Sequence, residues 1–138
     1  MRTIAIDAMG GENAPEAIVK AVLKAKNEMP ETKFLLFGDK EQLRELIPAD
    51  QINDQLGVVA TTETIADEDE PVKAIRRKKD SSMVVAANFV KEGKADALLS
   101  LGNTGALLAC GIFIIGRIKG IVRPGLMPTL PFQTRDDG

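Results

Sequence analysis

The sequence predicts an α/β fold with a largely parallel sheet and helices on both of its faces. Short apolar segments typical of strands alternate along the chain with longer segments of helical periodicity, and such alternation favours parallel sheets. The length of 138 residues suits a single domain, residues 1–138. Apolar residues make up 44% of the chain and charged residues 28%, as in globular proteins.

The first strand and the first helix are expected near the amino terminus. Thr3–Asp7 alternates and is β-branched, and the turn Ala8–Gly11 follows it. A helix is expected from about Asn13, because Asn13 and Glu16 form an Asn-x-x-Glu capping pattern with Pro15 in the first turn. Four apolar residues recur at intervals of four, three and four positions and predict the core face of this helix: Ile18, Val22, Ala25 and Met29.

The middle of the chain predicts two further strands and three further helices. The strands are Lys33–Phe37 and Gly57–Ala60, and the helices are Glu41–Ile47, Pro71–Lys79 and Met83–Glu92. Pro48 ends the first of these helices. The carboxylates of Asp67–Glu70 suit the start of the second, and Asp80–Ser82 caps the third, which ends at Gly93.

The last part of the chain predicts a fourth strand at Ala95–Ser100, a loop at Gly102–Gly105 and a very apolar helix over Ala106–Ile118. A helix that is apolar on nearly every side is buried in the core or in a subunit interface, and an acyl groove or cofactor channel is the alternative. Leu126–Leu130 is a candidate fifth strand, which Pro128 weakens.

Several functions are disfavoured by what the sequence lacks. It has no His, so it supplies neither a Ser-His or Cys-His pair nor a His-ligated metal, and it has no Trp or Tyr to stack on bases. Its single Cys110 excludes an internal disulfide, and the apolar neighbours of Cys110 favour a buried side chain over a reactive thiol. The net charge of −2 disfavours nucleic acid as a partner. We expect no metal and no cofactor.

The amino terminus does not read as a signal peptide, because Asp7 interrupts the first apolar stretch. The longest apolar run, Ala106–Ile115, is about half the length of roughly 20 residues that a bilayer span needs. A cytoplasmic location is therefore expected.

Three segments are expected at the carboxyl ends of the strands, where ligands of open α/β sheets gather. In the first, Asp7 ends a strand, and Gly10 and Gly11 let the backbone pass close to an anion at a helix start. A tight turn that needs glycine explains the same residues, and both interpretations are open. The dinucleotide fingerprint Gly-x-Gly-x-x-Gly is absent, which disfavours a dehydrogenase.

The second segment places four cations, Arg76–Lys79, just before the hydroxyls of Ser81 and Ser82. A bound phosphate would offset the unfavourable cations at the helix start. A solvated basic end of the preceding helix is the alternative, because it compensates the helix dipole by itself. The third segment is Ser100–Gly105, in which the backbone N–H groups, the Asn103 amide and the Thr104 hydroxyl are able to converge on a phosphate or an oxyanion. A structural turn explains that segment equally simply.

Taken together, these segments resemble one family. The resemblance is carried by their order and spacing: Asp7–Gly11 with Ala14–Glu16, then Arg76–Met83, Gly102–Ala106, Gly116–Ile121 and Arg123–Pro124. It is to the bacterial fatty acyl-acyl carrier protein:phosphate acyltransferases of phospholipid synthesis, and it extends to about Pro131. Members of that family are more than twice as long, so this chain is expected to be an amino-terminal part.

The resemblance implies a three-layer α/β/α sandwich, isocitrate/isopropylmalate dehydrogenase-like, and an enzyme that makes acyl phosphate from fatty acyl-acyl carrier protein and inorganic phosphate. It also implies a homodimer, peripheral contact with the inner face of the plasma membrane, and delivery of the product to a membrane glycerol-phosphate acyltransferase. Two alternatives stay open: a phosphotransacetylase-like enzyme that uses a small acyl-coenzyme A, and a non-catalytic folding or dimerisation role.

The hypothesis for the mechanism is direct attack of phosphate on the thioester, which needs no protein nucleophile. Asn103 and Lys79 are predicted to be catalytic, as oxyanion donor and charge partner. The remaining residues are predicted to bind phosphate or the rest of the substrate: Asp7, Gly10, Gly11, Lys78, Ser81, Ser82, Gly102, Thr104 and Gly105.

Overall fold

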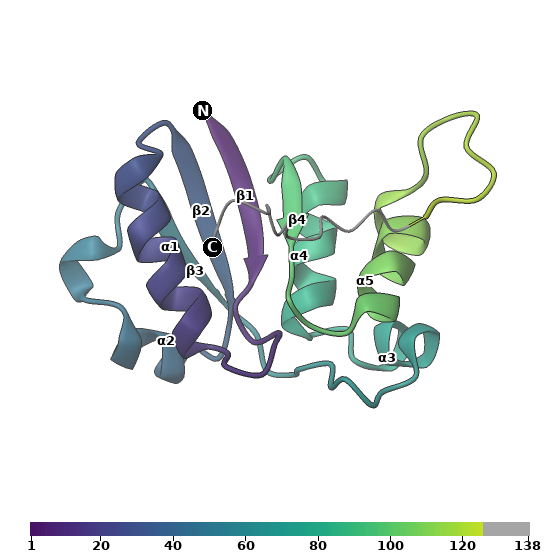
Figure 1. The fold of residues 1–138 in the computed structure, drawn as a ribbon, viewed down its shortest axis with the longest axis horizontal. Coiled ribbons are helices and arrows are strands. Elements are labelled where there is room, and N and C mark those ends of the chain that lie inside the picture. The colour runs from purple at the N-terminus through teal and green to yellow at the C-terminus, as the bar shows by residue number, and fades with distance from the viewer. Residues whose placement is uncertain (126–138) are drawn as a thin grey trace, which may run out of the picture.

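Figure 1 shows a computed structural model of the chain, in which residues 1–125 are described. Four parallel strands form one sheet in the order β3-β2-β1-β4. Their bounds are β1 Arg2–Asp7, β2 Thr32–Gly38, β3 Leu56–Ala60 and β4 Ala97–Leu99. The candidate fifth strand, Leu126–Leu130, lies outside the described residues.

Helices cover both faces of this sheet, so the predicted α/β sandwich is confirmed (Figure 1). The helices are α1 Glu16–Glu28, α2 Lys40–Leu46, α3 Pro71–Arg77, α4 Ser82–Lys91 and α5 Thr104–Cys110, with a 3₁₀ turn η1 at Ala49–Gln51 and a π-helical turn η2 at Gly111–Ile115. The helices α1 and α2 pack on one face and α4 on the other. The helices α3 and α5 extend the α4 side into a separate cluster.

The two faces follow from the alternation of side chains along each strand. On β2, Phe34 and Leu36 pack toward α1 and α2, whereas Phe37 packs toward α4. Phe37 meets Phe89 of α4 edge-to-face, with ring centroids 4.9 Å apart. Because β1 and β2 are the central strands, both of their faces are covered, and their central residues, Ile4–Ile6 and Phe34–Phe37, are continuously apolar.

Most of the predicted helix starts are confirmed by their caps. The Asp39 side chain accepts a hydrogen bond from Gln42 N at 3.0 Å at the start of α2. Glu70 accepts from Lys73 N at 2.7 Å at the start of α3, where Pro71 is the first helical residue. Ser81, which lies within the predicted cap Asp80–Ser82, is the N-cap of α4, and the helix begins at Ser82, one residue before the predicted Met83.

The prediction of an Asn13 cap for the first helix was wrong. The helix α1 begins at Glu16, Pro15 is its N-cap residue, and no side-chain cap hydrogen bond forms there. The Asn13 carbonyl instead accepts from Ala17 N at 2.9 Å. The residues before Glu16 form turns that lead the chain from the end of β1 to α1, and backbone groups satisfy one another in these turns.

The helix predicted over Ala106–Ile118 begins earlier and ends earlier. It starts at Thr104, widens into the π-helical turn at Gly111 and stops at Ile115, where Gly116 has a φ of 96° that favours glycine. Ala106, Ala109 and Cys110 are buried, but Phe113 is 61% exposed, so the helix is buried along one side only. No helix within residues 1–125 has the length and apolar character that crossing a bilayer requires.

We predict that Leu36→Ala lowers the free energy of unfolding by about 2–5 kcal/mol, because it leaves a cavity in the fully buried centre of the sheet. Urea unfolding followed by circular dichroism measures this change. Ile52→Ala is the matched control, since Ile52 is 41% exposed and its truncation should cost less than about 1 kcal/mol. Equal losses in the two variants would contradict the location of the core.

Candidate functional site

The carboxyl ends of β1 and β4 bring together three segments that are far apart in the sequence (Figure 1). They are the turn after Asp7, the first residues of α4 and the loop that leads from β4 to α5. Asp7 lies at the centre and is only 3% exposed. The first predicted segment therefore meets the start of α4 and the loop of the third segment at one edge of the sheet, as a parallel sheet requires.

The carboxylate of Asp7 is held by three donors. The Ser82 hydroxyl donates to Oδ1 at 2.5 Å, and Met9 N donates to the same oxygen at 3.1 Å. The Ser100 hydroxyl donates to Oδ2 at 2.8 Å. A buried carboxylate is tolerated when such donors replace water, and here they come from the turn after β1, from α4 and from the residue after β4.

Gly10 makes the closest backbone approach in this region. A Cβ atom at Gly10 would lie 2.7 Å from Asp7 Oδ2 and 2.8 Å from Gly102 N, distances that no side chain tolerates. Gly11 has a φ of 109°, in the left-handed region that favours glycine. The tight-turn interpretation of these two glycines is thus supported, and the turn packs directly on the Gly102 loop.

Ser81 and Ser82 are both buried, at 0% and 1% exposure. The Ser81 hydroxyl accepts from Val84 N at 3.3 Å, which caps α4. The Ser82 hydroxyl is directed to Asp7. Both predicted phosphate donors therefore lie under the surface and hold the start of α4 against the end of β1.

Asn103 caps α5 and also holds a loop in place. Its Oδ1 accepts from Ala106 N at 3.0 Å. Its amide nitrogen lies within hydrogen-bonding distance of three backbone carbonyls, at 3.1 Å, 3.4 Å and 3.0 Å: those of Ala66, Asp67 and Asp69. Donation from this amide to a ligand would require some of these bonds to open.

The residues after Asn103 form the first turn of α5. Thr104 is exposed, whereas Gly105 packs against α3, because a Cβ at Gly105 would lie 2.6 Å from Pro71 Cγ. The N–H groups of Thr104 and Gly105 are in the first helical turn, where the helix itself provides no acceptor. These N–H groups and the Thr104 hydroxyl are thus the donors of the third segment that the helix leaves for other partners.

Lys78 and Lys79 differ in their surroundings. Lys78 Nζ forms an ion pair with Asp69 Oδ2 at 2.6 Å and donates to Thr64 O at 2.8 Å. The hydrogen bond from Lys78, and to a smaller extent the one from Ala66 N, lowers the pKa of Asp69 below its usual range. Lys79 is exposed and forms no ion pair within residues 1–125, so no carboxylate of the described residues neutralises its charge.

Cys110 lies on α5 and is fully buried, as its apolar neighbours predicted. Burial, together with the negative charge of Asp7, raises the pKa of its thiol to about 11. The thiol is therefore protonated at neutral pH and is a poor nucleophile.

One apolar pocket adjoins the polar cluster, and a second lies apart from it. The first has a volume of about 170 Å³ and lies between α1 and the end of β4; we call it the α1–β4 pocket. It is lined by Ile6, Asp7, Ile18, Ala21, Val22, Ala25, Phe34, Leu99, Ser100 and Leu101. Asp7 and Ser100 thus belong both to the polar cluster and to this pocket.

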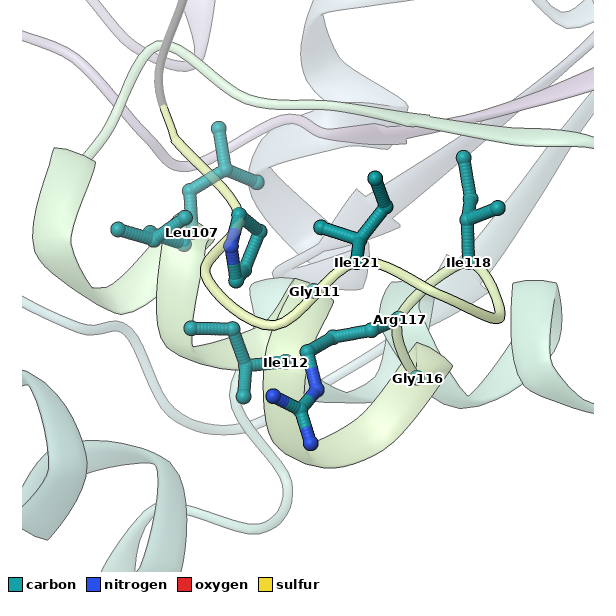
Figure 2. Close-up of a pocket in the computed structure, with 9 residues that line it drawn as sticks. Leu107, Gly111, Ile112, Gly116, Arg117, Ile118 and Ile121 are labelled. Atoms are coloured by element: carbon teal, nitrogen blue, oxygen red, sulfur yellow. The ribbon is translucent and has the colours of Figure 1, made fainter.

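The second pocket, of about 310 Å³, lies between the far end of α5 and the chain that follows it. Figure 2 shows side chains that line this pocket, among them Leu107 of α5, Ile112 of η2, and Arg117 and Ile121 of the chain that follows. The Arg117 guanidinium donates to Val122 O at 2.5 Å. Because this pocket is at the opposite end of the helix from Thr104, it is separate from the polar cluster.

Sequence reasoning assigned no role to Ser100 or Asp69. Ser100 ends the predicted fourth strand and begins the third candidate segment, Ser100–Gly105, and its hydroxyl at the same edge as Asp7 is a usable signal. Asp69 was assigned to a helix start, and its ion pair with Lys78 spans nine residues through a turn that no local pattern indicates.

Comparison with known proteins gives a consistent result. The model of the family described as fatty acid synthesis protein matches residues 2–137. The phosphate acyltransferase of Lactobacillus acidophilus is 98% identical over 138 residues, which are 100% of this chain and 41% of that protein. The phosphate acyltransferases of Lactobacillus helveticus (92%) and Ligilactobacillus salivarius (58%) also match over the full chain, covering 41% and 40% of their own lengths. The chain thus spans about two fifths of the length of these curated relatives.

We predict that Gly10→Ala destabilises the fold by about 1–3 kcal/mol, because the added Cβ meets Asp7 and the Gly102 backbone, which cannot move aside as a flexible side chain does. The control is Gly111→Ala, where nothing lies within 4 Å of the added Cβ and the helical backbone should gain up to about 1 kcal/mol. Urea unfolding measures both. If Gly10→Ala were as stable as the parent protein, the close packing of the two loops would be refuted.

Proposed function

This chain belongs to the family of fatty acid synthesis proteins, and on that basis we propose that the full-length protein transfers a fatty acyl group from acyl carrier protein to inorganic phosphate. A phosphate oxygen attacks the thioester carbonyl carbon, the new C–O bond forms and the C–S bond breaks. The sulfur leaves on the carrier and takes up a proton, and acyl phosphate is the product. The name of the relatives, phosphate acyltransferase, supports phosphate as the acceptor.

The observation that carries this proposal is the position of the polar cluster beside the α1–β4 pocket. Acyl transfer to phosphate needs polar groups for a dianion next to an apolar surface for the acyl group. Asp7 and Ser100 border the pocket, and because the Ser100 hydrogen is directed to the Asp7 carboxylate, the donors proposed for the dianion are those at the start of α5. A direct attack also suits a chain that has no His and whose only Cys is buried and protonated.

The roles proposed for the residues follow from their surroundings. The N–H groups of Thr104 and Gly105, with the Thr104 hydroxyl, would contact the phosphate or the oxyanion, because helix starts favour anions. Lys79 would supply positive charge from the rim. The other residues would build and brace the site: Asp7, Gly10, Gly11, Ser81, Ser82 and Gly102 as its floor, and Lys78 and Asn103 as braces of the loop at Ala66–Asp69.

Partners and location are part of the same proposal. We take acyl carrier protein as the donor, a homodimer as the assembly, and the inner face of the plasma membrane as the place where the product passes to a glycerol-phosphate acyltransferase. Exposed apolar side chains after α5 support contacts with further protein or with a lipid surface, since Ile118 is 81% exposed and Val122 is 78% exposed.

A related reaction with a small acyl-coenzyme A, as in phosphotransacetylases, is favoured by one observation. The α1–β4 pocket has a volume of only about 170 Å³, which suits a short acyl group better than a long one. The preference for the acyl donor separates the two reactions.

We predict that a protein of the relatives' full length, given fatty acyl-acyl carrier protein and phosphate, forms a product that hydroxylamine converts to hydroxamate. Hydroxamate should form faster when phosphate is present than when it is omitted, because hydroxylamine traps acyl phosphate faster than it cleaves the thioester. Acetyl-coenzyme A in place of the carrier tests the small-donor reaction. Folded full-length protein that yields no phosphate-dependent hydroxamate with either donor would refute phosphate acyl transfer.

We predict that Lys79→Ala raises the KM for phosphate about tenfold, because one charge-assisted contact is lost. Its free energy of unfolding should stay unchanged, since Lys79 is exposed. Steady-state kinetics with varied phosphate measures the effect. Lys24→Ala is the control, as Lys24 is exposed on α1 and loses the same charge. An equal KM in both variants would remove Lys79 from the phosphate site.

A further inference from the structure

The Ser100 side chain lies between the Asp7 carboxylate and the backbone N–H of Gly102 and forms a hydrogen bond with each. No other side chain within residues 1–125 is bonded to both groups. The Ser100 hydroxyl donates to Asp7 Oδ2 at 2.8 Å and accepts from Gly102 N at 3.1 Å. A serine hydroxyl has a single hydrogen to donate, and an ionised carboxylate only accepts. The direction of both bonds is therefore set: the hydrogen points to Asp7, and a lone pair faces Gly102.

The other contacts of Asp7 keep this arrangement in one orientation. Oδ1 is occupied by Ser82 and Met9 N, so Oδ2 is the oxygen that faces Ser100. Because these donors come from the turn after β1 and from α4, the carboxylate does not turn without breaking bonds to both segments. Through its two hydrogen bonds, Ser100 fixes the loop at Gly102 relative to Asp7 at the end of β1.

Gly102 is fixed from its other side by Gly10. The hypothetical Cβ of Gly102 would lie 3.2 Å from Gly10 Cα and 3.3 Å from Ser100 Oγ. The backbone of Gly102 is therefore held between a glycine turn and a serine hydroxyl. The residues that follow it are the N-cap of α5 and the first-turn N–H groups of Thr104 and Gly105.

We propose that Ser100 is a positioning residue for acyl transfer to phosphate. It acts through Gly102: its hydroxyl sets where the N–H groups at the start of α5 point, and hence their alignment with the developing oxyanion. This inference rests on the proposed function and adds to it a residue whose role is to orient donors. Misaligned donors weaken stabilisation of the transition state more than they weaken binding of phosphate.

Ser100→Ala tests this proposal in a protein of the relatives' full length. The expected result is a kcat about tenfold lower in the hydroxamate assay, with the KM for phosphate within about twofold of the parent value. Ser100→Thr retains the hydroxyl and should restore most of kcat. Thr62→Ala is the matched control, because it also removes a hydroxyl that donates to a carboxylate, that of Asp80 at 2.5 Å. The control should lose stability without losing kcat.

Hydrogen–deuterium exchange provides a readout that does not depend on the reaction. In Ser100→Ala, exchange should become about tenfold faster in the peptide that contains Gly102 to Leu107, since Gly102 N has lost its acceptor; in Thr62→Ala it should not change there. Unchanged kcat and unchanged exchange in folded Ser100→Ala would overturn the proposal. If the parent protein lacked phosphate-dependent activity while exchange still accelerated, the proposed function would fall and with it the catalytic role, but the structural link from Ser100 to the loop would stand.

Discussion

The buried carboxylate of Asp7 is the interaction on which the geometry of the candidate site depends. A carboxylate without water is costly unless donors surround it, and here they do so at 2.5 Å, 2.8 Å and 3.1 Å. Two of the donors are separated from Asp7 by 75 and 93 residues in the sequence. Satisfying one charge therefore forces β1, α4 and the end of β4 to meet in one arrangement, and this arrangement sets the positions of the loops around it.

This constraint also decides which groups are left for a ligand. Ser82 and Ser100 direct their hydrogens to Asp7, and Ser81 serves as a helix cap, so these hydroxyls form the floor of the site. The donors that our proposal assigns to the ligand are the backbone N–H groups at the start of α5 and the exposed ammonium group of Lys79. A second set of bonds, from Asn103 and Lys78 to the loop at Ala66–Asp69, braces this arrangement from the α3 side.

Polar residues of this kind are easy to assign to catalysis from sequence alone, because the same side chains serve as caps, braces and ligands. Asn103 illustrates the difficulty. Its position before an apolar helix is compatible with a donor to an oxyanion as well as with a cap. In the structure it caps α5, and its amide nitrogen lies within hydrogen-bonding distance of three backbone carbonyls. The distinction depends on where the loop at Ala66–Asp69 lies, and no pattern near Asn103 contains that information.

The sequence by itself determined the order of strands and helices, the parallel sheet and most helix starts, because these follow from alternation, proline positions and caps within a few residues. Asp39, Glu70 and Ser81 act as caps through bonds to residues three positions away. The Asn13 cap failed because turns leading from β1 delay the helix to Glu16. Only the tertiary structure decided that Ser100 links Asp7 to Gly102 and that Lys78 pairs with Asp69, since such bonds form when the sheet and its helices have packed and distant segments share one edge.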